Sequence, residues 1–188
     1  MSRMLFLVPR MYTENEFRDL ASTIPQDFGP RTLEFWSYVE DKLKVFVGRI
    51  RRVYRDEVCE GGEKALAYLS AVDCENFLIA KKLVDGGAVF EATEDSMLVA
   101  EWASWFEAVR RNPLDGISLE MLQDTVHERG SYVSRRVDET LQDEETGVLF
   151  VKPGLTVNVN GFDRVIRVCR FDPADYLRSW QVQLETKL

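Results

Sequence analysis

The sequence predicts a helix-rich α/β fold in which a single domain, residues 1–188, surrounds a small and mostly parallel sheet. Short apolar runs typical of buried strands alternate with longer segments of helical period, and this order is characteristic of a parallel sheet covered by helices. A length of 188 residues suits one domain. Apolar residues make up 45% of the chain and aromatic residues 11%, which is enough for a core and argues against disorder.

The first half of the chain predicts two strands and four helices. Residues 4–8 form an apolar run closed by a proline, which predicts a strand. Thr13 and Glu16 have the spacing of a capping box and predict a short helix over residues 13–22. The next predicted elements are a helix over residues 32–48, a strand (preferred to further helix) over 49–58, and helices over 61–72 and 74–87.

The second half predicts three more strands and three helices. They are a strand over residues 88–92, a helix over 93–111, a long helix over 118–141, strands over 147–151 and 164–171, and a helix from Pro173. Apolar residues at helical spacing predict a buried stripe on each of the two central helices. The stripes are Leu98, Trp102, Trp105 and Val109 on the first helix, and Leu119 to Leu141 on the second.

Charge and cysteine content exclude several classes of protein. The chain has 32 acidic and 24 basic residues, a net charge of -8, which opposes binding to nucleic acid. Three cysteines without a CxxC pair predict free, buried thiols and neither a disulfide framework nor a zinc site. No apolar run is long enough for a signal peptide or a membrane span, so we expect a cytoplasmic protein without a membrane partner.

Several kinds of catalytic or cofactor site lack their residues. His127 is the one histidine, and it lies in a charged stretch of the long helix where exposure to solvent is the favoured interpretation. Histidine-rich metal sites and serine or cysteine triads are therefore not expected. Neither the glycine-rich dinucleotide motif nor a P-loop is present. We predict no metal and no cofactor.

Charged side chains follow the predicted strands at their carboxyl ends. Arg10 follows the first strand and Lys152 the fourth, while Glu91, Glu94 and Asp95 follow the third. In a parallel sheet these ends lie on one edge, where open α/β sheets bind their ligands. A mixed-charge pocket is expected there, with carboxylates able to bind a cation or act as acid and base. The favoured alternative is that the carboxylates stabilise the start of the next helix.

A basic run lies in the predicted second strand. Its interpretation as a surface face balanced by Asp56 and Glu57 is preferred to a grip on a phosphate or an acidic partner. The arginines are Arg49, Arg51, Arg52 and Arg55.

The segment from Glu128 to Val151 resembles the C-terminal part of the TraB/Tiki-like superfamily. It reads ERGSYVSRRVDETLQDEETGVLFV, an arginine-containing helix followed by an apolar strand. The N-terminal stretch MLFLVPRMYTE resembles the same superfamily more weakly. Members of that superfamily are considered metal-dependent hydrolases or peptidases whose strands run on into Gly-x-x-His. This chain has Lys152-Pro153-Gly154 and Pro9-Arg10-Met11-Tyr12 at those places. The resemblance therefore implies the fold and a pocket-facing Arg129, but not the metal ligands or the hydrolase activity.

We accordingly predict a non-catalytic binding or regulatory protein on a TraB/Tiki-like α/β scaffold. Because Lys152 stands where that family has histidine, the expected ligand is a small anion, with a protein partner as the other choice. The residues predicted to bind the ligand are Arg10, Glu91, Glu94, Arg129 and Lys152.

Two other functions stay open. The first is a carboxylate-based metal-dependent hydrolase that uses Glu91, Glu94 or Asp95 as ligands or general base. The second is an interaction subunit, including a homo-oligomer, in which Trp102 and Trp105 are exposed anchors. Packing of these two indoles in the core is the favoured interpretation.

Overall fold

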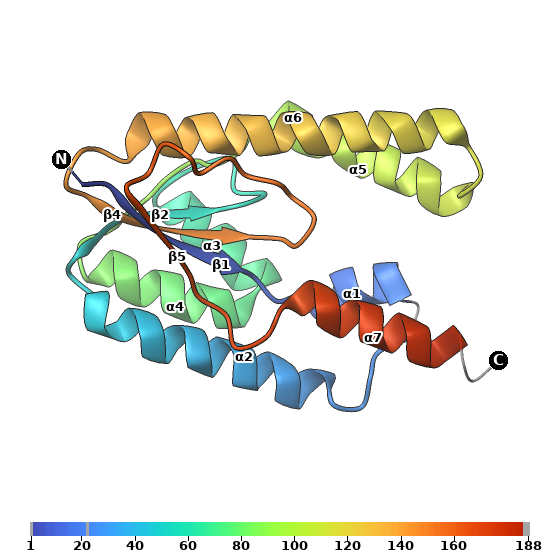
Figure 1. The fold of residues 1–188 in the computed structure, drawn as a ribbon, viewed down its shortest axis with the longest axis horizontal. Helices are drawn as coiled ribbons and strands as arrows, with labels where there is room; N and C mark the ends of the chain where they lie inside the picture. The colour runs from blue at the N-terminus through green and yellow to red at the C-terminus, as the bar shows by residue number, and fades with distance from the viewer. Residues whose placement is uncertain (1, 22, 186–188) are drawn as a thin grey trace.

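A computed structural model describes residues 2–21 and 23–185 and places them around one five-stranded sheet (Figure 1). The strand order is β3-β2-β4-β1-β5, and every neighbouring pair is parallel. The structure is 56% helical, which confirms the predicted helix-rich α/β class. The strands are β1 (Met4–Pro9), β2 (Ile50–Arg55), β3 (Val89–Phe90), β4 (Thr146–Val151) and β5 (Arg164–Arg167).

The helices largely follow the predicted ones, and the largest shifts of a helix start are those of the second and fifth helices. The second helix begins at Phe28 because Pro30 falls in its first turn, where the missing N–H is tolerated. The fifth begins at Ser96, since Asp95 caps it. The helices are α1 (Glu14–Ala21), α2 (Phe28–Leu43), a 3-10 turn η1 (Lys44–Phe46), α3 (Glu63–Val72), α4 (Cys74–Asp85), α5 (Ser96–Arg111), α6 (Gly116–Thr140) and α7 (Pro173–Glu185). Residue 22, in the predicted first helix, lies outside the described residues.

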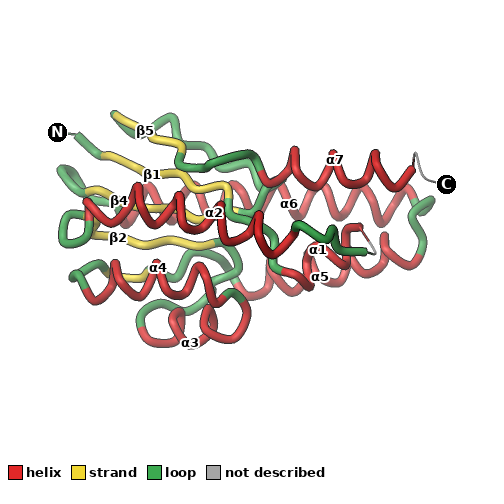
Figure 2. Tube along the Cα trace, turned by 90° about the horizontal axis from the view of Figure 1, so that it is seen from below, coloured by secondary structure: helices red, strands yellow, loops and turns green. Residues whose placement is uncertain are grey.

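The direction of the connections places helices on both faces of the sheet. From β1 the chain crosses β4 to reach β2 and then moves outward to β3. From β3 it returns across β2 to β4, and then crosses β1 to reach β5. Because crossovers between parallel strands are right-handed, opposite directions put the connections on opposite faces. Helices α2 and α4 accordingly cover one face and α6 the other (Figures 1 and 2).

Alternate side chains of the central strands enter two separate cores. Phe6 and Phe150 belong to the larger core, which α2, α3 and α4 close. Leu5 and Leu149 belong to the smaller core, which α6 and the loop after β4 close. Since β1 and β4 are buried on both faces, they are continuous apolar runs in the sequence, as is usual for parallel strands.

The apolar stripe predicted on α5 is wrong as a core prediction. No residue of α5 is buried, and Trp102 and Trp105 are half-exposed. On α6 the stripe holds only for its second half, because Leu119 is 41% exposed whereas Val133 and Val137 are buried. The outer halves of these helices extend beyond the carboxyl ends of the strands, so no sheet lies beneath them (Figures 1 and 2).

Two predictions from composition have structural outcomes. The cysteines are free, as predicted, but none of the three is buried: Cys74 is exposed, Cys59 is half-buried, and Cys169 is half-buried against the larger core. Across residues 2–21 and 23–185, no helix combines the length and the apolar character needed to cross a bilayer.

Candidate functional site

The carboxyl ends of β2 and β4 form a topological switch point. The two strands are neighbours, but the chain leaves β2 toward one edge of the sheet and leaves β4 toward the other. In open α/β sheets, ligands bind in the crevice outside such a point. Arg55, Asp56 and Glu57 lie at the end of β2, Lys152 follows β4, and Arg10 follows β1.

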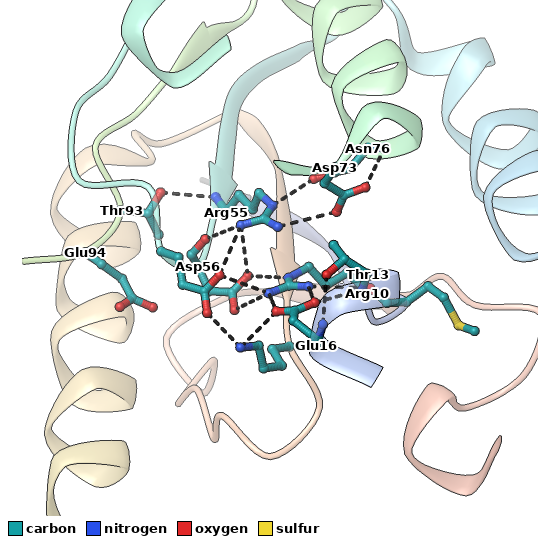
Figure 3. Close-up of polar contacts among 12 residues, drawn as sticks. Arg10, Thr13, Glu16, Arg55, Asp56, Asp73, Asn76, Thr93 and Glu94 are labelled. Atoms are coloured by element: carbon teal, nitrogen blue, oxygen red, sulfur yellow. Dashed lines mark hydrogen bonds and ion pairs between the residues drawn. The ribbon is translucent and has the colours of Figure 1, made fainter. Parts of the chain in front are cut away.

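Six charged side chains gather here, and we call them the ionic cluster. They are Arg10, Glu16, Arg55, Asp56, Glu57 and Lys152. Arg10 joins most of them: its Nε donates to Asp56 at 2.7 Å, and its two terminal nitrogens donate to Glu16 at 2.9 and 2.8 Å. Figure 3 shows Arg10 and Arg55 converging on Asp56. Arg10 and Asp56 are fully buried and Arg55 is 1% exposed.

Backbone hydrogen bonds and a capping box place these side chains. The N–H of Arg10 donates to Val151 and the N–H of Asp56 to Phe150, so both residues extend the sheet ladder past the strand ends. The Thr13 N–H donates to the Glu16 carboxylate and the Glu16 N–H to the Thr13 hydroxyl. The predicted capping box is thus present, and it turns Glu16 toward Arg10.

The cluster balances three cations against three carboxylates. Burial opposes the charge of Arg10, but Asp56 and Glu16 outweigh it and raise the pKa of Arg10 above its ordinary value. Burial would raise the pKa of Asp56 and of Glu16, yet the guanidinium of Arg10 holds both below their ordinary range. All three groups are therefore charged at neutral pH, and the cluster is formally neutral.

Lys152 extends from the cluster toward Trp102. Its ammonium lies 2.7 Å from Glu57 Oε1 and 2.9 Å from Glu16 Oε1, and its side chain is 15% exposed. The same nitrogen lies 4.6 Å from the centre of the Trp102 ring. This is within the range of a cation–π contact.

A second buried ion pair lies beside the cluster. Arg129 on α6 donates from Nε and Nη2 to the two oxygens of Glu94, at 2.8 and 3.0 Å. Burial raises the pKa of Glu94 despite this partner. The guanidinium carbon of Arg129 lies 4.7 Å from the Trp102 ring centre, so Trp102 contacts both cations.

A cavity of about 230 Å³ adjoins both groups, and we call it the edge pocket. Its polar lining includes Asp56, Arg129 and Lys152. Its apolar walls come from α5, α6, α1 and α7, through Trp102, Phe106, Leu122, Val126, Leu20 and Leu177. Trp102 of the α5 stripe and the neighbouring Phe106 thus form one wall of this pocket.

The residues predicted from the strand ends divide into separate groups. Arg10 and Lys152 lie in the ionic cluster, and Glu94 pairs with Arg129 next to it. Glu91 pairs with Arg52 instead and does not line the edge pocket.

The three carboxylates after β3 do not converge. Asp95 accepts from the N–H groups of Met97 and Leu98, so it caps α5, while Glu91 and Glu94 each pair with a different arginine. Within the described part of the chain, no three His, Cys, Asp or Glu side chains are grouped so that they could hold a metal ion. The hydrolase alternative stays a prediction.

The interpretation of the basic run as a balanced surface face is wrong for its last members. Arg55 and Asp56 are buried, and Glu57 bonds Lys152 across the sheet edge. Arg55 also donates to Asn76, and it pairs with Asp73 at 3.4 Å. The signal that could have revealed them is their position at the end of a strand, the rule that identified Arg10 and Lys152.

A larger hollow of about 540 Å³ lies elsewhere, between α6 and the loop after β4. It contains His127, which is exposed, with Ser131, Ser134 and Arg135. None of the buried ion pairs reaches it, and the switch point of the sheet lies at the edge pocket. The edge pocket is therefore the better candidate site.

Comparison with known proteins reveals no relative. No family model matches the chain, and neither a curated protein nor a solved structure matches it. The resemblance to the TraB/Tiki-like superfamily stays a prediction.

Proposed function

We propose that this protein binds a small, largely apolar molecule in the edge pocket without catalysing a reaction on it. The observation that carries the proposal is the placement of Lys152 and Arg129, which carboxylates hold against Trp102 in the lining of an apolar pocket. A few fixed polar groups among apolar walls, at the switch point of a sheet, are the usual composition of a small-molecule site.

Both cations keep N–H groups for a ligand. The ammonium of Lys152 has three donors, and Glu57 and Glu16 take two of them. Among the described residues, Nη1 of Arg129 has no hydrogen-bonding partner, because Glu94 accepts only from Nε and Nη2. A carbonyl or hydroxyl oxygen of the ligand can accept from these groups while its apolar part packs against Phe106.

The charge balance favours an uncharged ligand. The sequence predicts an anion from Lys152 alone, but Glu16 and Glu57 balance that lysine and Glu94 balances Arg129. A bound phosphate would add uncompensated negative charge beside buried carboxylates, which is costly. The volume of about 230 Å³ lies below the ~300–1,000 Å³ that is usual for ligand pockets, so the ligand is small.

The state of the carboxylates supports binding without catalysis. A general base works best when its pKa lies near the working pH. Despite their burial, Arg10 holds the pKa of Glu16 and Asp56 low, which makes both weak bases. Burial raises the pKa of Glu94, but both of its oxygens accept from Arg129.

Three fragments of similar size and different charge test the proposal: benzamide, benzoate and phenyl phosphate. We expect benzamide to bind best, with a Kd of about 1 mM, which corresponds to ~0.5 kcal/mol for each of its nine non-hydrogen atoms and lies within the ~0.3–1.5 kcal/mol that such atoms contribute in small ligands. Benzoate should bind more weakly and phenyl phosphate not measurably. Ligand-observed NMR and calorimetry give the three affinities. If phenyl phosphate binds best, the ligand is an anion, as the sequence predicts, and the proposal of an uncharged ligand is wrong.

A pair of variants on α6 locates the bound fragment. Val126→Trp places a large ring in the edge pocket and should abolish binding of benzamide. Ile117→Trp adds the same ring to the same helix at a position that is 72% exposed, and it should leave the affinity unchanged. The proposal is wrong if no uncharged fragment binds, or if benzamide binds Val126→Trp as well as it binds the wild type.

A further inference from the structure

Glu57 has a backbone conformation that its residue type disfavours. Its φ is +66°, and it is the third residue of the turn from Arg55 to Val58, which the N–H of Val58 closes on the carbonyl of Arg55 at 3.3 Å. A positive φ at this place in a turn is normally given to glycine or asparagine. Glutamate has no such preference, so the turn is strained here.

The strained backbone places the Glu57 side chain between Lys152 and Arg10. The side chain is 13% exposed, and one carboxylate oxygen accepts from Lys152 Nζ at 2.7 Å while the other lies 3.3 Å from Arg10 Nη2. Glycine would relieve the turn but offer no acceptor, and asparagine is shorter by one methylene and uncharged. Unlike glycine and asparagine, glutamate places a charged oxygen within hydrogen-bonding distance of the Lys152 ammonium.

We infer that Glu57 positions Lys152 for the ligand of the edge pocket, and this inference rests on the proposed function. Lysine has a long, flexible side chain, and its head loses much freedom when it is held over an aromatic ring. Glu57 holds the head from the β2 side and Glu16 from the α1 side, which leaves one N–H for the pocket. Glu57 acts through Lys152 and need not touch the ligand.

The chain contains a matched control for the backbone strain. Glu144 also has a positive φ, of +65°, as the third residue of a turn from Gln142 to Glu145 that the N–H of Glu145 closes at 3.1 Å. Glu144 is exposed, and it precedes β4 at the opposite end of the sheet from the edge pocket. Replacing Glu144 by glycine changes the same backbone conformation without touching the site.

The experiment compares Glu57→Gly with Glu144→Gly by three measurements: the melting temperature, the affinity for benzamide, and the ¹⁵N NMR signal of the Lys152 ammonium, assigned by its loss in Lys152→Met. Glu144→Gly should raise the melting temperature and leave the signal and the affinity unchanged. Glu57→Gly should weaken benzamide binding about tenfold and broaden the ammonium signal through faster proton exchange. Glu57→Gln keeps a hydrogen-bond acceptor but loses the charge, so its benzamide affinity and its ammonium signal should lie between those of the wild type and Glu57→Gly. It replaces Glu57→Gly in the comparison if that variant does not fold.

The outcomes separate the two proposals. If the Lys152 signal and the affinity are unchanged in Glu57→Gly, or in Glu57→Gln when only that variant folds, positioning by Glu57 is wrong while binding in the edge pocket stands. If no fragment binds the wild type but the Lys152 signal is lost in Glu57→Gly, the positioning stands and the proposed function is wrong.

Discussion

Breaking the pair between Arg129 and Glu94 should destabilise the protein strongly, and the cost should depend on pH. The two side chains are 3% and 1% exposed and share two hydrogen bonds. Removing one member of such a pair leaves a buried charge alone, which costs about 3–5 kcal/mol of unfolding free energy. We expect this cost at pH 8 for Arg129→Met.

The pH dependence follows from the carboxylate left behind. Burial already raises the pKa of Glu94, and without Arg129 it rises further above the ordinary 4.5. The folded state then binds a proton that the unfolded state has released, so stability falls as pH rises above about 4.5, by at most ~1.4 kcal/mol per pH unit. The cost of Arg129→Met should therefore be clearly smaller at pH 5 than at pH 8.

Urea unfolding followed by circular dichroism at both pH values measures these costs, with a constant m value as the check on two-state behaviour. The double variant Glu94→Leu/Arg129→Met removes both charges and should lie within about 1–2 kcal/mol of the wild type, because replacing a whole buried pair is often neutral. A cost below about 1 kcal/mol for Arg129→Met, or the same cost at both pH values, would mean that the pair behaves like an exposed one.

Three further changes test other parts of the structure. Gly130→Ala on α6 should lower the free energy of unfolding by about 1–3 kcal/mol, because the added Cβ would collide with the Thr156 carbonyl oxygen. Gly116→Ala in the same helix is the control: its Cβ meets no atom within 4 Å, so thermal unfolding should show no loss of stability. Glu16→Gln should flatten the acid limb of the stability curve: despite burial, Arg10 lowers the pKa of Glu16, so the wild type loses this contribution as pH falls below about 4.5. An unchanged limb would contradict that assignment. Arg10→Met removes the closest cation from the fully buried carboxylate of Asp56 and should give no folded protein by circular dichroism, and a cooperative melt would refute the burial of Arg10.

The fold could be predicted because its strands are buried on both faces. The runs that became β1 and β4 are apolar at nearly every position, so no knowledge of their partners was needed. The α5 stripe has the same kind of pattern, but its burial depends on whether a sheet lies beneath it. That is decided by the length of the helix relative to the strands, which the periodicity of α5 alone does not contain.

The sequence identifies the cations Arg10 and Lys152 of the ionic cluster but not the carboxylates that pair with them. The position after a strand identified Arg10 and Lys152, whose partners Asp56 and Glu57 lie in a run of mixed charges typical of a surface. Whether such a run is buried depends on what the rest of the chain brings against it. Here β1 and β4 bring a guanidinium and an ammonium, and these arrive from distant parts of the sequence.

The place of β1 in the sheet has a consequence for folding. Met4 at its start pairs with Thr146 on one side and Arg164 on the other, so both neighbours of the first strand are synthesised last. Sheets dominated by such distant pairings fold slowly and expose unpaired apolar strands on the way. On the ribosome the β1 segment, and Arg10 after it, must therefore wait until most of the chain has emerged. Chaperones that hold apolar segments should bind nascent chains ending before residue 146 and release them once β4 and β5 are made.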